Sequence, residues 1–247
     1  MTVDVAGVLR DAWVMAKRDR EMLIGVAGAL ILVPAIAQEM FVTAPPPLPA
    51  SGSDTAALQA WIEAATIWSR QNDLLLFGLS LVAVFGALVL FWLYTDRTRP
   101  SVGEALSNGI AFLPRYVLLA LCIALPVNIG TLLLLIPGLY LKGRLLPVGP
   151  IFVAERPIGV FAAWRRSFAM TRGNGLILMA LACVPLLGGD LLAMPFKLLG
   201  QSLDGAPMAN PVVAAVLDCV VGVCRTVGVV ASILIEVALY RRLSKGM

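Results

Sequence analysis

The run from Leu74 to Tyr94 constrains the fold most strongly, because its 21 residues include no charged side chain. A helix of that length, rising 1.5 Å per residue, is about 30 Å long, which matches the hydrocarbon thickness of a bilayer. Across the chain 60% of the residues are hydrophobic and 14% are charged, roughly half the charged fraction of a soluble domain. The sequence therefore predicts an all-α, polytopic membrane protein.

Six membrane spans are predicted, together with stretches whose apolar residues recur at helical spacing. We expect the spans at residues 22–42, 74–94, 113–129, 131–153, 176–195 and 211–240. The amphipathic stretches fall at residues 3–20, 54–70, 101–112 and 157–172, and we expect them to lie in the membrane interface. Residues 1–247 are interpreted as a single integral membrane domain. A surface helix followed by a two-span hairpin recurs three times, which indicates either an internal repeat or chance similarity in apolar sequence.

Basic residues divide unequally between the two sets of connecting segments. One set carries only Arg70 and Lys197, whereas the other carries 14 basic residues: Arg10, Lys17, Arg18, Arg20, Arg97, Arg99, Arg115, Arg156, Arg165, Arg166, Arg172, Arg241, Arg242 and Lys245. Lys and Arg are enriched in cytoplasmic loops. The sequence thus predicts that both termini are cytoplasmic, in the inner membrane of a bacterium.

The predicted fourth span is irregular, and several ionisable residues fall inside spans. A turn is expected at residues 127–130 and a break at Pro137-Gly138. The intramembrane ionisable residues are Lys142, Arg144, Asp190, Asp218, Arg225 and Glu236. Such groups are normally paired or line a polar cavity, because charge in hydrocarbon is costly. Arg144 and Arg225 are expected near mid-membrane, and Asp218 is the carboxylate nearest in sequence to Arg225. A polar pathway, a lipid-headgroup site and structural ion pairs all remain open.

Residues 157–172 combine an aromatic pattern with basic residues. Phe161, Trp164 and Phe168 follow one helix face, and neighbouring Arg side chains suit contact with anionic phospholipids. The candidate residues for a lipid-headgroup or polar-pathway site are Arg144, Glu155, Arg156, Arg165, Arg166, Ser167, Thr171 and Arg172. The alternatives are helix capping for the two hydroxyl residues and basic charge that only sets the topology.

Part of this pattern resembles a known family. Pro137-Gly138, Arg144, Glu155-Arg156, Ser167, Thr171 and Gly173 are similar to the pattern of the YciC-like bacterial inner-membrane proteins. The same pattern occurs in the membrane domain fused to some glycerophosphodiester phosphodiesterases. The resemblance covers roughly residues 100–180, with Phe168 and Met170 where Trp and Leu are commoner. It implies a six-span inner-membrane protein associated with envelope integrity, without the catalytic domain of the fused relatives.

The composition disfavours most enzyme classes. The chain has no His, which is the commonest general base and metal ligand. Its four Cys lie in apolar runs without zinc spacing, and it lacks a Gly-x-Ser-x-Gly elbow. We therefore expect no catalytic residues, metal, cofactor or nucleic-acid partner. Two hypotheses are favoured: a non-enzymatic protein acting through lipids, anionic phospholipids above all, or through a membrane-protein partner, and a transporter or lipid-handling protein that uses the broken fourth span.

Overall fold

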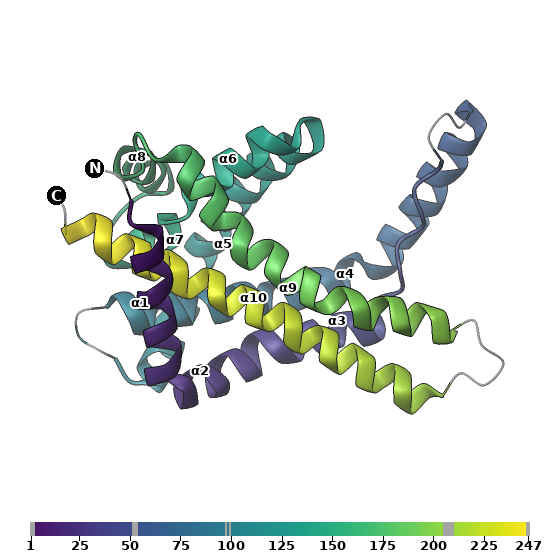
Figure 1. Cartoon of the computed structure of the whole chain (residues 1–247), viewed down its shortest axis with the longest axis horizontal. Helices are drawn as coiled ribbons and strands as arrows, with labels where there is room; N and C mark the ends of the chain where they lie inside the picture. Colours follow the sequence, from purple (N-terminus) through teal and green to yellow (C-terminus); the bar gives the residue numbers. More distant parts are fainter. Residues whose placement is uncertain (1–2, 51–53, 97, 99, 205–209, 246–247) are drawn as a thin grey trace.

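The structure is a computed structural model that describes residues 3–50, 54–96, 98, 100–204 and 210–245. Every regular element in these ranges is helical (Figure 1). In chain order the helices are α1 (Val5–Arg18), α2 (Arg20–Ala27), the π-helical turn η1 (Gly28–Leu32), α3 (Val33–Phe41), α4 (Thr55–Thr95), α5 (Val102–Leu133), α6 (Leu135–Leu145), α7 (Val148–Ala154), α8 (Val160–Met170), α9 (Gly175–Asp204) and α10 (Pro211–Lys245). Arg97 and Arg99, counted above as basic connector residues, lie outside the described residues.

Among the described residues, five helices are long and apolar enough to cross a membrane. They are Arg20–Phe41, Thr55–Thr95, Val102–Leu133, Gly175–Ser202 and Pro211–Lys245. The first contains η1 just before Pro34. Proline lacks an amide hydrogen and its ring crowds the carbonyl four residues earlier, so the preceding turn widens to a π-helical one.

Two predicted amphipathic stretches do not form separate helices. Residues 54–70 and 74–94 merge into α4, and residues 101–112 continue into the predicted third span as α5. The expected caps are present: the Asp54 carboxylate accepts from the Ala57 amide at 2.8 Å, and Ser101 and Glu104 form a capping box. The polar residues between the paired segments are compatible with a helix, and Ser69 donates to Asp73 one turn later at 2.8 Å. Helix α4 therefore continues without a break, and α5 continues through Pro114 and Pro126.

The predicted fourth span is broken, but not at the expected positions. Residues 127–130 lie inside α5, and the chain turns at Leu134, whose backbone is extended. Pro137 falls in the first turn of α6, where a missing amide hydrogen removes no helical hydrogen bond. The second break follows α6 at residues 146–147. Likewise, α9 continues through Pro195 to Asp204, beyond the predicted end of the fifth span at 195.

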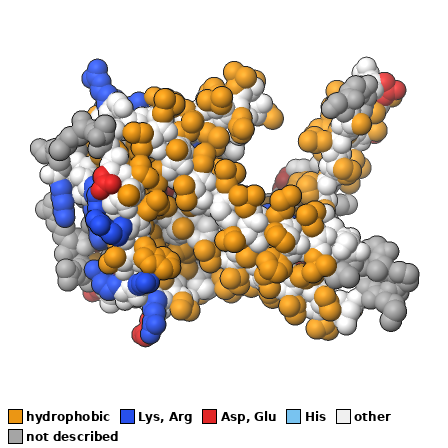
Figure 2. All heavy atoms as spheres, in the orientation of Figure 1, with side chains coloured by type: hydrophobic (Ala, Val, Ile, Leu, Met, Phe, Trp, Pro, Cys, Tyr) orange, Lys and Arg blue, Asp and Glu red, His pale blue; other side chains and the backbone are white. Residues whose placement is uncertain are grey.

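Helices α9 and α10 lie side by side and antiparallel, and they form the long axis of the bundle (Figure 1). The most deeply buried side chains come from residues 88–91 of α4, 151–153 of α7 and 233–239 of α10. Hydrophobic side chains cover most of the face in Figure 2, whereas Lys and Arg gather at the end that holds both termini. This arrangement follows the unequal distribution of basic residues in the sequence.

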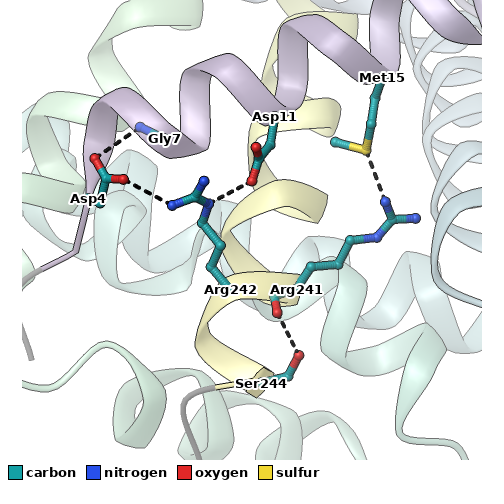
Figure 3. Close-up of polar contacts among 7 residues, drawn as sticks. All are labelled: Asp4, Gly7, Asp11, Met15, Arg241, Arg242 and Ser244. Carbon is teal, nitrogen blue, oxygen red and sulfur yellow. Dashed lines mark hydrogen bonds and ion pairs between the residues drawn. The ribbon is translucent and has the colours of Figure 1, made fainter.

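Helix α1 is fastened across the end of α10 by a polar clasp (Figure 3). Arg242 pairs with Asp11 at 2.6 Å and with Asp4 at 3.1 Å, and Arg241 donates to the Met15 sulfur at 3.2 Å. The pKa of Asp4 is lowered by a hydrogen bond from the Gly7 amide and then by Arg242, and the pKa of Asp11 is lowered by its hydrogen bond from Arg242. Both carboxylates therefore stay ionised at neutral pH, and the clasp carries full charge.

Candidate functional site

Three residues of the family resemblance, Arg144, Ser167 and Thr171, meet where the end of α6 contacts α8. The Arg144 Nε donates to the Thr171 hydroxyl at 2.9 Å, and its Nη2 donates to the Phe168 carbonyl at 2.7 Å. In return, the Ser167 hydroxyl donates to the Arg144 carbonyl at 2.8 Å. Ser167 and Thr171 are fully buried. Arg144 thus pins the end of α6 to the C-terminal turn of α8 and its cap residue Thr171, rather than lying unpaired within a span.

The other candidates in this region divide into paired and exposed groups. Arg156 pairs with Asp96 at 2.6 Å and covers the Trp92 ring at 3.8 Å. Burial acts to raise the pKa of Asp96, but hydrogen bonds from Thr98 and Arg156 hold that pKa below its usual value. Glu155 pairs with Arg166 at 3.2 Å. The exposed cations are Arg165 and Arg172. A lipid headgroup at this face would therefore contact these two side chains first.

The predicted aromatic face of residues 157–172 is only partly buried. Phe161 is 75% exposed. Trp164 and Phe168 are half-buried and contact each other with ring centroids 6.5 Å apart. Ala163, Ser167 and Met170 form the buried side of α8. Helix α8 therefore packs on the protein through Ala163, Ser167 and Met170, with Trp164 and Phe168 also against the hydrophobic core, whereas Phe161 stays exposed.

Arg225 forms ion pairs with residues from two other helices. Its guanidinium pairs with Glu39 of α3, and its Nε lies 3.7 Å from Asp190 of α9. Glu39 also pairs with Lys197 at 3.4 Å. The partners seen here are far from Arg225 in sequence, whereas Asp218, the partner considered above, lies on the same helix. The cluster ties α3, α9 and α10 together.

A charged cavity of about 410 Å³ extends along α10 from this cluster. We call it the Arg225 cavity; its ionisable lining residues are Tyr116, Lys142, Asp190, Arg225 and Glu236. Arg225 and Glu236 are 11 residues apart, which corresponds to about 16 Å along a helix. The lining comes from α4, α5, α6, α9 and α10. The cavity therefore lies inside the bundle of apolar helices, where charge is unusual.

A second cavity of about 490 Å³ shares three lining residues with the first. We call it the Asn128 cavity; α6 and α7 of the broken fourth segment form one of its walls, and α4, α5 and α10 supply the rest. Tyr116, Lys142 and Glu236 line both cavities. We call these three residues, which carry a phenol, an ammonium and a carboxyl group, the junction between the cavities.

The charges at this junction are weakly satisfied by the protein. Glu236 accepts one long hydrogen bond, from the Ser232 hydroxyl at 3.4 Å. Within the described ranges, no carboxylate lies within 4.0 Å of the Lys142 ammonium. Those ranges also contain no group of three or more His, Cys, Asp or Glu that could hold a metal ion. The junction can bind a charged group of either sign, and its residues do not indicate a metal centre.

Sequence reasoning identified four of the charged lining residues: Lys142, Asp190, Arg225 and Glu236. It did not single out Tyr116, Asn128 or Ser232, since uncharged polar residues are common in membrane helices. Glu39 was considered only as the end of the first span. The position of Glu39 beside a long apolar run was a usable signal, because a carboxylate in that setting predicts a cationic partner.

The fold and the charged cavity define an all-helical membrane protein. No protein-family model matches the chain, and no solved structure matches it. A UPF0259 membrane protein of Pectobacterium carotovorum is 34% identical to the chain over 89 residues. The match covers 36% of the chain and 35% of that protein's length. This similarity supports a bacterial membrane protein family, and it does not extend to the glycerophosphodiester phosphodiesterases.

Proposed function

We propose that the chain is a non-enzymatic, multi-pass protein of the bacterial inner membrane that binds phospholipid headgroups in the two joined cavities. The observation that carries this proposal is the junction, where the broken fourth segment presents Lys142 opposite Glu236 and Tyr116. Irregular backbone at membrane depth is tolerated where it is packed in protein or lines a cavity, and broken helices commonly mark binding sites in transporters.

The charges favour a phospholipid over an apolar ligand. A headgroup phosphate would pair with the Lys142 ammonium, which has no carboxylate within 4.0 Å among the described residues. Glu236 would accept from an amine or hydroxyl of the same headgroup. The exposed Arg165 and Arg172 add attraction for anionic phospholipids, each contributing about 1 kcal/mol near an anionic surface. A role in envelope integrity, which the family resemblance implies, is consistent with lipid handling.

The proposal includes six membrane crossings with cytoplasmic termini. Residues 135–154, which form α6 and α7, would make the sixth crossing as a broken span, in addition to the five long helices. Reporter fusions ending at Thr55 and at the C-terminus are expected to report opposite sides of the membrane, with the C-terminus cytoplasmic. Both reporters on one side would contradict the six-crossing topology.

Replacing Lys142 by Gln is expected to weaken phospholipid binding about tenfold, because a charge-assisted contact contributes about 1.5 kcal/mol. Native mass spectrometry of the detergent-solubilised full chain, titrated with phosphatidylglycerol or phosphatidylethanolamine, measures this. Lys245→Gln is the matched control, since Lys245 is exposed at the end of α10. Equal lipid retention by the two variants would contradict a headgroup site at the junction.

A further inference from the structure

An apolar groove of about 530 Å³ lies on the other side of the contact between α9 and α10. Its volume is in the range typical of small-molecule sites, about 300–1,000 Å³. Helix α1 forms one wall, α2 and η1 form a second, and α9 and α10 form the floor. Its one hydroxyl, on Thr226, donates to the Gly222 carbonyl at 2.8 Å. The groove thus offers hydrocarbon contact along its length.

The close contact between α9 and α10 separates this groove from the Arg225 cavity. Pro185 and Gly189 of α9 and Gly228 of α10 line both spaces. A Cβ added at Gly189 would lie 3.2 Å from the Gly228 Cα, so the two backbones touch there. The groove and the cavity are therefore two sites, and occupancy of one does not require the other.

The groove carries positive charge at one end. Trp13 of α1 lines it, and the Lys17 ammonium lies 5.0 Å from the centroid of the Trp13 ring. On α10 the groove extends from Thr226 to Ile235, nine residues or about 14 Å. An elongated apolar channel with a cation at one end is complementary to an amphiphile that has an anionic head and a hydrocarbon tail.

The clasp between α1 and α10 keeps this groove formed. Leu9, Ala12, Trp13 and Ala16 of α1 line the groove, while Asp4 and Asp11 of the same helix are held by Arg242 (Figure 3). Because α1 contributes a whole wall, the groove exists only while α1 is docked on α10.

From this arrangement we propose that the groove binds one acyl chain of an anionic phospholipid, whose phosphate lies at Lys17. This lipid site goes beyond the cavity site proposed above, and it uses none of the residues at the junction. Its occupant is a lipid rather than a helix of another chain, because the apolar lining ends at a cation, which suits a phosphate headgroup.

Gly188 allows a specific test, because it lines the groove and no protein atom lies within 4 Å of a Cβ added there. The Cβ of a Leu at this position would meet no protein atom, and the rest of the side chain would take up volume in the groove. Gly78 on α4 is the matched control: a Cβ there also meets nothing within 4 Å, and Gly78 does not line the groove. The probe is phosphatidylglycerol with a photoreactive acyl chain, added to the full chain in nanodiscs.

We expect photolabelled peptides from α1 and α10 in the wild type, several-fold less labelling in Gly188→Leu, and wild-type labelling in Gly78→Leu. Lys17→Gln should abolish the preference for phosphatidylglycerol over phosphatidylcholine, whereas Lys245→Gln should retain it. Equal labelling of wild type and Gly188→Leu would overturn the proposal, as would a groove-to-groove crosslink between two copies of the chain. Lys142→Gln should leave this labelling unchanged, so failure of the cavity site and failure of the groove site are distinguishable.

Discussion

Arg225→Ala is expected to destabilise the protein by about 3 kcal/mol or more, the cost typical of breaking a buried ion pair by removing one partner. Glu39 is 12% exposed and would keep only Lys197 as a partner, at 3.4 Å. Asp190 would also lose its nearby guanidinium. The expected result is a lower midpoint of unfolding in mixed detergent and SDS micelles, with α3 released from α10.

A double-mutant cycle identifies the partner. Arg225→Ala combined with Glu39→Gln should destabilise less than the sum of the two single changes, because each single change already breaks the same pair. Arg225→Ala combined with Asp218→Asn should be close to additive, since seven residues along α10 separate the side chains by about 10 Å. Additivity with Glu39→Gln would show that the pair between α3 and α10 contributes nothing.

Arg144→Gln is expected to destabilise the protein by about 2 kcal/mol, because it leaves the Phe168 carbonyl and the Thr171 hydroxyl with fewer partners in a buried setting. Arg144→Lys should be nearly as damaging. A lysine keeps the charge but cannot donate from two rigidly spaced nitrogen atoms, as the guanidinium does here.

The lysine variant separates two interpretations of Arg144. If Arg144 served only to orient the chain in the membrane, Arg144→Lys would behave like the wild type in thermal unfolding and in topology assays. The control is Arg165→Gln, which removes an exposed guanidinium from the adjacent helix α8 and should change the unfolding temperature little. Equal stability of Arg144→Gln and Arg165→Gln would contradict the pinning role.

The helical class and most apolar segments were predictable from the sequence, since a run such as Leu74 to Tyr94 can satisfy its backbone in lipid only as a helix. Helix boundaries were less predictable. The turn at Leu134 has no Gly or Pro of its own, and Pro137 marks the start of α6 because proline is tolerated in a first turn. Where polar but helix-compatible residues join two segments, as before Leu74, the sequence contains no signal that the helix ends or continues.

The candidate site was predictable in its residue types but not in its pairings. A charged side chain in hydrocarbon is costly in free energy. The sequence alone therefore identifies Lys142, Arg225 and Glu236 as residues that need a polar environment. The identity of each partner depends on how helices far apart in sequence pack together, and a single sequence contains no information on that packing. The Arg144 network shows the same limit: the residue types did not indicate that Arg144 would contact Ser167 and Thr171.

The length of α4 has a consequence for what lies outside the bilayer. Its 41 residues span about 61 Å, and a helix tilted by 40° needs only about 26 residues to cross about 30 Å of hydrocarbon. About 15 residues must therefore extend beyond the hydrocarbon at any usual tilt. The N-terminal part of α4 exposes Leu58, Ile62 and Ile67. The proline-rich segment before it is held alongside by Trp61 and Trp68, whose indole N–H groups donate to the Pro46 and Thr43 carbonyls. Helix α4 thus extends beyond the lipid tails, and the apolar side chains of its N-terminal part are only partly covered by the proline-rich segment.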